Sequence, residues 1–232
     1  MKTIKINFRG FTLLEVLVSI AIFAAIVAVL YPSYTGTFQN IEYTEAEAEI
    51  YQMARIALER ITKDIKSAYL PPWGNDNESE DELIQRTNFF AEDEDINGRS
   101  ADFLRFFCNT HLVFREEDRP GNAFISYYIK EREDESFVLY RNDTHEFDEP
   151  PEEETGGLLL CENLYSLEFT YFDEEGDSYD DWDSSGDMFK GKLPEMVTIK
   201  LEFINGSDPE SVIKFMTSVS LSMASNRYDN IS

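Results

Sequence analysis

An apolar run near the N-terminus limits most strongly what this chain can fold into. From Phe11 to Leu30 the sequence reads FTLLEVLVSIAIFAAIVAVL, twenty residues in which Glu15 is the only charge. A helix of this length extends about 30 Å, which matches the thickness of the hydrocarbon core of a bilayer. The run therefore predicts a single membrane-spanning helix, with the rest of the chain folded outside the membrane.

The charges on either side of the run predict which end crosses the membrane. Lys2, Lys5 and Arg9 precede it, and the first charge after it is acidic, Glu42. Basic residues remain on the cytoplasmic side of a membrane. We therefore expect a cytoplasmic N-terminus and an exported C-terminal body.

The overall charge excludes nucleic acid as a partner. The chain has 46 Asp and Glu against 20 Lys and Arg, a formal net charge of −26, and a phosphate backbone would be repelled by it. Its 18 Phe, 12 Tyr and aliphatic runs supply more apolar surface than a disordered acidic chain carries. The exported part is therefore expected to be a folded acidic body.

A second helical pattern follows the apolar run. Between Tyr43 and Ala68 apolar residues recur at three- and four-residue steps, and charged residues occupy the opposite face. Pro32 should kink the combined helix, and Pro71-Pro72 should end it. The apolar stripe comprises Ile50, Met53, Ala54, Ala57, Leu58, Ile61 and Ile65.

The remaining chain has the composition of β-strands. Its apolar segments are rich in aromatic and β-branched residues, and alternation is clearest at Val197/Ile199/Leu201/Phe203. We expect an α+β fold in which the long N-terminal helix packs against an antiparallel β-sheet. A hairpin turn is predicted near Asp134-Glu135, and long loops at 74–100, 142–157 and 173–191. The predicted strands are Phe103–Cys108, Ala123–Arg132, Ser136–Arg141, Leu158–Cys161, Leu164–Phe172, Met196–Ile204 and Val212–Leu221.

The start of the apolar run carries a specific motif, RGFTLLEVLVSIAIF, from Arg9 to Phe23. It resembles the type IV prepilin family, in which a short basic leader ends in Gly, followed by Phe and by Glu at the fifth mature position. The resemblance implies that a prepilin peptidase cuts after Gly10 and methylates Phe11. It divides the chain into a leader at 1–10, a transmembrane segment at 11–31, an amphipathic helix at 32–70 and a pilin-like, periplasmic head at 71–232.

Glu15 has a physical interpretation of its own. A carboxylate in hydrocarbon costs about 2.5 to 3.5 kcal/mol on insertion scales, so such residues usually have a partner. Cleavage after Gly10 would free the α-amino group of Phe11, and this amine on a neighbouring subunit could pair with Glu15 when helices pack into a filament. The alternative is a carboxylate that reaches back to water at the interface. The motif favours the assembly role.

The C-terminal body is similar to the J-type minor pseudopilin of type II secretion. The segments that carry this resemblance are YYI at 127–129, LYR at 139–141, LEFTYFDEEG at 167–176 and LPEMVTIKLEF at 193–203. It implies an inner-membrane, single-pass subunit of the pseudopilus tip, acting in protein export. Its implied partners are the I-type and K-type minor subunits, the major pseudopilin and the prepilin peptidase.

Cys108 and Cys161 are the only cysteines, in a body that is expected to reach an oxidising compartment. A disulfide between them is permitted there. Both lie among apolar strand residues, where buried thiols without a bridge are also common. Both alternatives remain open at the level of sequence.

Asp93, Asp95, Asn97 and Gly98 copy the first half of a calcium-binding loop. Leu104 occupies the position where the bidentate Glu of such a loop is required. A solvated acidic turn is therefore favoured over a calcium site, and no other cofactor is predicted. The acidic residues between Asp177 and Asp187 have the same interpretation.

No catalytic residues are predicted. His111 and His145 belong to no cluster with metal-ligand spacing, and the sequence has neither a nucleophile motif nor a phosphate-binding glycine loop. The chain is not expected to be an enzyme. Two other functions are retained as alternatives: a minor pilin of a type IV pilus or DNA-uptake system, and a membrane-anchored periplasmic module that binds calcium or another ligand.

Overall fold

The computed structural model describes residues 12–70, 88–108, 123–144, 156–206 and 208–221. The chain divides into two units, Met1–Glu47 and Ala48–Ser232, which are described separately. The boundary between them falls inside the amphipathic helix predicted for 32–70.

One long helix, α1, runs from Leu13 to Lys66. It continues through Pro32, and the hydroxyl of Thr35 donates to the carbonyls of Tyr31 and Pro32 at 3.1 Å each. α1 ends four residues before the predicted limit at 70, because the backbone amides of Ser67 and Ala68 close tight turns onto the carbonyls three residues earlier.

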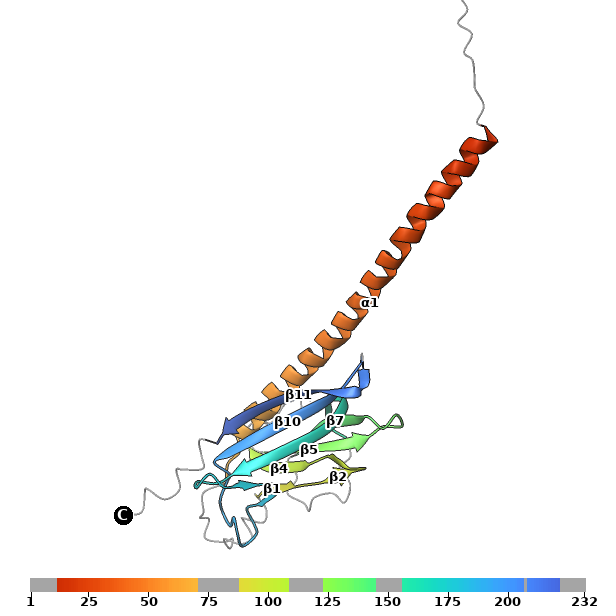
Figure 1. The fold of residues 1–232 in the computed structure, drawn as a ribbon. Helices are drawn as coiled ribbons and strands as arrows, with labels where there is room; N and C mark the ends of the chain where they lie inside the picture. Colours follow the sequence, from red (N-terminus) through yellow and green to blue (C-terminus); the bar gives the residue numbers. More distant parts are fainter. Residues whose placement is uncertain (1–11, 71–87, 109–122, 145–155, 207, 222–232) are drawn as a thin grey trace, which may run out of the picture. The chain divides into compact units, whose positions relative to one another are not determined.

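The second unit contains a nine-stranded sheet in the order β11-β10-β7-β6-β5-β4-β1-β9, with β8 paired to β7. Figure 1 labels β11, β10, β7, β5, β4 and β1 of this sheet. All pairings between its strands are antiparallel. A separate two-stranded sheet joins β2 and β3. The strands are β1 Phe89–Glu92, β2 Asp95–Ile96, β3 Arg99–Ser100, β4 Phe103–Cys108, β5 Ala123–Glu131, β6 Phe137–Thr144, β7 Leu158–Phe172, β8 Ser178–Tyr179, β9 Trp182–Asp183, β10 Met196–Asn205 and β11 Asp208–Ser220.

The core of this unit lies between the C-terminal part of α1 and one face of the sheet. The predicted apolar stripe of α1 supplies Ile50, Ala54, Ala57, Ile61 and Ile65, all buried. The sheet supplies side chains at alternate positions, as the period of two along a strand requires. The predicted α+β fold with a helix on an antiparallel sheet is therefore confirmed. On β10 the alternating residues are Val197, Ile199, Leu201 and Phe203, each fully buried.

The predicted hairpin between β5 and β6 turns where the sequence indicated. Glu135 adopts a positive φ of 62°, and the amide of Glu135 donates to the carbonyl of Arg132 at 3.0 Å. The Asp134 carboxylate accepts hydrogen bonds from the amide and the hydroxyl of Ser136. A short polar turn with these local bonds fixes the register of the two strands.

Three parts of the sheet differ from the sequence prediction. β1 lies inside the predicted loop 74–100, and β8 and β9 lie inside the predicted loop 173–191. The segments predicted as separate strands, 158–161 and 164–172, form one strand, β7. Asn163 of that strand has a positive φ of 60°, and the pairing of β7 with its neighbours shifts register near this point. The strand is irregular there but does not end.

Candidate assembly site

The first unit has an unusually apolar and uncovered surface. Leu13–Pro32 has a mean hydropathy of 2.8, and none of this span is buried within the chain. Leu13 is 81% exposed and Phe23 is 68% exposed. An apolar helix with no covering side chains needs lipid or other helices around it, which is how membrane-spanning segments are stabilised.

Glu15, the only charge in this span, forms a capping box with Thr12 at the start of α1. The carboxylate accepts hydrogen bonds from the backbone amide and from the hydroxyl of Thr12, both at 3.0 Å. In return the amide of Glu15 donates to the Thr12 hydroxyl at 3.4 Å. The arrangement satisfies amides that a helix start leaves without partners. Glu15 is therefore partnered locally in the single chain, and its side chain remains exposed.

The hydroxyl of Ser19, one turn farther along the span, forms its hydrogen bond within the helix. The Ser19 hydroxyl donates to the carbonyl of Glu15 at 2.7 Å. Internal bonds of this type are the ones that hydrocarbon tolerates, since no water is available there. Gly10 and Phe11, the predicted cleavage and methylation positions, lie outside the described residues.

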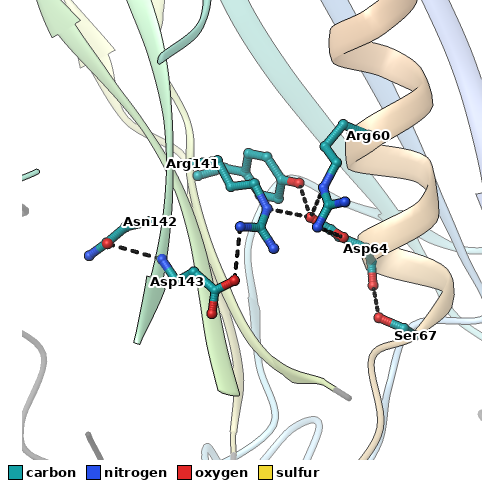
Figure 2. Close-up of polar contacts among 7 residues, drawn as sticks. Arg60, Asp64, Ser67, Arg141, Asn142 and Asp143 are labelled. Carbon is teal, nitrogen blue, oxygen red and sulfur yellow. Dashed lines mark hydrogen bonds and ion pairs between the residues drawn. The ribbon is translucent and has the colours of Figure 1, made fainter. Parts of the chain in front are cut away.

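In the second unit, a buried ionic cluster fixes α1 on the sheet (Figure 2). Asp64 of α1 is fully buried, and its carboxylate accepts from the Nε of Arg141 on β6 at 2.6 Å and from the hydroxyl of Tyr127 on β5 at 2.7 Å. Arg60, one turn earlier on α1, pairs with the same carboxylate at 2.9 Å. The second carboxylate, Asp143, accepts from Nη1 of Arg141 at 3.0 Å.

Opposite charges are paired in this cluster. The Asp64 carboxylate contacts Arg60 and Arg141, and Asp143 contacts Arg141, and such pairing is the condition for burying ions at acceptable cost. Burial works against the charge of Arg141, but the neighbouring Asp64 carboxylate outweighs it and raises the pKa of Arg141. Burial, together with the charge of Asp64, raises the pKa of the Tyr127 phenol well above its usual value. The phenol therefore stays protonated and donates to Asp64.

Comparison with known proteins gives two family matches that together cover most of the chain. The family described as type II secretion system (T2SS), protein J matches residues 33–214, and the prokaryotic N-terminal methylation motif matches residues 5–31. The chain belongs to the type II secretion system protein J family. It is also 32% identical over 72 residues to the pilin-like protein PilA3 of Thermus thermophilus, and the match spans 31% of the length of each chain.

The two family matches divide this J-family chain within α1, ahead of the boundary between the two units. The methylation motif covers the exposed apolar span up to Tyr31, and the J match runs from Ser33 in α1 to Lys214 on β11. The predicted resemblance to the prepilin and pseudopilin superfamily, and to its J type, is confirmed. An apolar N-terminal helix with a prepilin-type motif is the arrangement of a membrane-anchored protein.

The suspected calcium motif forms a hairpin turn. Asn97 and Gly98 have positive φ angles of 57° and 78° and connect β2 to β3, as an Asn-Gly pair does in a two-residue turn. The Asp95 carboxylate accepts from the amide of Gly98 at 2.7 Å, and the Asn97 amide group donates to Glu131 at 3.0 Å. Among the described residues no group of three or more His, Cys, Asp or Glu is placed to hold a metal ion. Asp95 and Asn97 therefore make hydrogen bonds within and beside a turn, and Asp93 lies between β1 and β2.

Cys108 and Cys161, both in the described part of the chain, are not joined by a disulfide. Cys108 ends β4 and Cys161 lies on β7, and β5 and β6 separate these strands in the sheet. Two intervening strands hold the backbones about 14 Å apart, beyond the reach of a disulfide. Of the two alternatives that the sequence left open, this structure has the buried thiols without a bridge. Burial, with a smaller effect of Glu162, raises the pKa of the Cys161 thiol to about 12.

The acidic segment at 177–187 packs around aromatic rings. Trp182 is buried and stacks on Phe189 with a ring separation of 3.8 Å, and Tyr179 contacts both rings edge-on. The Asp183 carboxylate accepts from the amide and the hydroxyl of Ser185. His111 and His145 lie outside the described residues.

A buried carboxyl, Asp102, joins the start of β4 to β7. It is 2% exposed, and Oδ2 accepts from the amide of Phe169 at 2.6 Å. Burial raises the pKa of this carboxyl to about 7, the hydrogen bond from Phe169 opposes the rise, and the nearby carboxylates of Asp93, Glu168 and Asp180 add to it. Asp102 therefore titrates near neutral pH.

The contacts of four residues were not predicted from the sequence: Thr12, Asp64, Arg141 and Asp102. For Thr12 and Asp64 the sequence does contain a signal. Thr12-Leu13-Leu14-Glu15 has the spacing of a capping box before an apolar run. Asp64 follows Ala57 by seven residues and Ile61 by three, so it falls on the apolar face of the helix and requires a buried partner. Nothing local in the sequence identifies Arg141 as that partner.

Proposed function

We propose that this J-family chain is a minor pseudopilin of the type II secretion system, a structural subunit of the pseudopilus tip that acts in protein export. The single observation that carries the proposal is the match to protein J over residues 33–214, next to an N-terminal methylation motif at 5–31. The role is one of assembly rather than of catalysis.

In this proposal the chain is inserted in the inner membrane as a single-pass protein. The N-terminus, with Lys2, Lys5 and Arg9, stays in the cytoplasm, and the unit from Ala48 onward lies in the periplasm. A prepilin peptidase cuts between Gly10 and Phe11 and methylates Phe11. The exposed apolar face of Leu13–Pro32 then leaves lipid for contact with equivalent helices of other subunits.

The partners in this proposal are other pseudopilins, with the I-type and K-type minor subunits next to this one at the tip and the major pseudopilin below. The cluster of Arg60, Asp64, Tyr127 and Arg141 supports this role because it holds the α1 segment after Ala48 rigidly on the sheet. A rigid head presents its partner-binding surfaces in a fixed orientation.

The test is recovery of partners and secretion from cells that carry the tagged full-length chain. After cross-linking in intact cells and extraction in detergent, we expect further proteins with prepilin-type N-termini to copurify. A strain that lacks the chain should accumulate exported proteins in the periplasm and regain export on complementation. Normal export together with loss of surface pili would instead indicate a type IV pilus subunit, and normal export without any pilin-like partner would indicate a simple membrane anchor.

A further inference from the structure

β11 leaves one edge of the large sheet open. It is the terminal strand and pairs only with β10 among the described residues (Figure 1). The outer edge of such a strand carries backbone amides and carbonyls that can pair with another strand. Edges of this kind are usually protected by charges or proline. In β11 such residues stand at its start, Asp208, Pro209 and Glu210, and from Ser211 to Ser220 the only charge is Lys214. Lys214 pairs at 2.8 Å with Glu202 of β10.

A groove of about 1250 Å³ lies between this strand and the part of α1 in the same unit. Its walls include three residues with exposed apolar surface: Tyr51 at 57%, Ile56 at 52% and Met216 at 71%. Tyr51 meets Phe215 edge-on at 5.1 Å, so the helix and the strand are in contact along one side of the groove. Side chains of a strand added to β11 would have room in this groove.

The groove is positively charged in a strongly negative chain. Arg55, Lys63 and Lys66 line it together with one carboxylate, Glu59, whereas the whole chain has a net charge of −26. None of the three cations forms an ion pair with another described residue. Cations in excess over the one carboxylate of the groove, beside an open edge, favour an acidic occupant.

We propose that an extended acidic segment of a neighbouring subunit adds as a strand to the outer edge of β11 and places its acidic and apolar side chains in this groove. The open backbone edge favours a strand over a helix, since a helix makes no main-chain bonds to its partner. A docked helix would also require a continuous apolar stripe, and the α1 wall instead presents Gln52, Glu59 and Thr62 between its cations. That the segment comes from another pseudopilin rests on the proposed function.

The first experiment measures binding of a synthetic peptide to the detergent-solubilised full-length chain by fluorescence anisotropy. The probe is a peptide of about ten residues with alternating Glu and Val, which matches the length of a strand and places both side-chain types in register. Two control peptides keep the length. One has Lys in place of Glu. The other keeps the Glu/Val sequence but has alternate backbone nitrogens methylated, so that one edge of the peptide cannot donate backbone hydrogen bonds.

We expect the Glu/Val peptide to bind with an affinity that falls as salt rises, and both controls to bind at least about tenfold more weakly. Binding should also slow hydrogen exchange at the β11 amides around Met216. Equal binding of the methylated peptide would overturn strand addition and leave a docked helix or charge alone as the explanation. Absence of binding by every peptide would overturn the site.

Matched variants of the chain test the charge of the groove. Lys63 and Lys66 are exposed, so the double change Lys63→Glu, Lys66→Glu leaves the core intact. It should reduce peptide affinity by about tenfold or more. The control, Lys190→Glu with Lys192→Glu, makes the same change in net charge at exposed positions outside the groove and should bind like the parent. An equal loss of peptide affinity in both double variants would show a general effect of net charge and contradict the proposal.

One further outcome concerns the chain itself. The acidic residues from Asp76 to Glu82 could compete with the peptide for the same cations. If their replacement by Asn and Gln creates peptide binding that the parent lacks, the occupant is part of this chain and the intersubunit proposal is wrong. The peptide measurements do not depend on secretion, so a failure here leaves the proposed pseudopilin function unaffected.

Discussion

Thr12 and Glu15 cap the start of α1 reciprocally, with the Glu15 carboxylate 3.0 Å from both the amide and the hydroxyl of Thr12. In the single chain this carboxylate therefore already has hydrogen-bond donors. Assembly would have to exchange those donors for the amine of a neighbouring Phe11, or share the carboxylate between the two. Capping and pairing between subunits are thus two separable roles of one side chain.

The first prediction separates these roles. Glu15→Ala should leave membrane insertion and processing intact but lower secretion and partner recovery, because the neighbouring amine loses its carboxylate. Thr12→Ala removes the cap at a cost of about 1 kcal/mol but keeps the carboxylate, so assembly should be nearly unchanged. Secretion assays and cross-linked partner yield measure both. Equal defects in the two variants would assign Glu15 to capping, and unchanged secretion in Glu15→Ala would contradict pairing between subunits.

The second prediction concerns the contact between Asp64 and Arg141. Both side chains are fully buried, so Asp64→Ala leaves a guanidinium without its main partner and should destabilise the head by about 3 to 5 kcal/mol. The double variant with Arg141→Leu should lose less than the sum of the single changes. Denaturant unfolding of the detergent-solubilised chain, followed by tryptophan fluorescence, gives the free energy of unfolding of the parent, both single variants and the double variant. Additive losses would show that the two residues do not interact energetically.

The third prediction follows from Asp102. Its pKa in the folded state, about 7, lies above the ordinary value of 3.8, so the folded state holds this proton more tightly than the unfolded chain does. Its contribution to stability is therefore fully present below about pH 4 and is lost as the pH rises through about 7, with a total change of about 4 kcal/mol. In the Asp102→Asn variant the side-chain carbonyl can still accept the hydrogen bond from the Phe169 amide. The variant has no carboxyl to titrate, so this pH-dependent contribution to stability should be absent.

The measurement for Asp102 is the difference in unfolding free energy between parent and variant across pH 4 to 8. That difference should grow in favour of Asp102→Asn as the pH rises. Glu174→Gln, a change at an exposed carboxylate, serves as the control and should give a flat difference. A flat difference for Asp102→Asn as well would show that the buried carboxyl does not titrate in this range.

The fourth prediction concerns Cys108 and Cys161. Both are buried and unbridged, and the raised pKa of Cys161 disfavours its reactive thiolate. Iodoacetamide should therefore modify neither thiol quickly in the folded protein and both in denaturant, without prior reduction. Intact-mass measurement counts the added groups. A requirement for reductant before the denatured chain reacts would reveal a disulfide.

Local patterns were sufficient for the main features of the fold. The apolar run from Phe11 predicted the first part of α1 by its length and its lack of charges. The stripe from Ile50 to Ile65 predicted the second part by its period of 3.6 residues. The alternation at Val197 to Phe203 predicted β10, because a period of two residues is typical of a strand with one buried face. β1, by contrast, has four residues between acidic segments, too few to establish a period, and its pairing with β4 and β9 is set by the tertiary fold.

The division of β7 into two predicted strands has a local cause. The irregular position at Asn163 interrupts the alternation along β7, so a single strand has the pattern of two. Asp95-Ile96-Asn97-Gly98 belongs to a calcium-loop pattern and to a hairpin-turn pattern alike, and the acidic turn that the sequence favoured connects β2 to β3. The partner of Asp64 could not be predicted, since Arg141 lies 77 residues farther along the chain.

The central claim is that the apolar helix is retained after removal of a short basic leader, and mass spectrometry of the N-terminal peptide of the purified chain tests it most directly. We expect a peptide that begins at Phe11 and carries one added methyl group on its α-amino nitrogen. A peptide that begins at Met1 would contradict it, and so would one that begins near Ala28, where an ordinary secretory signal peptide could be cut after the apolar run.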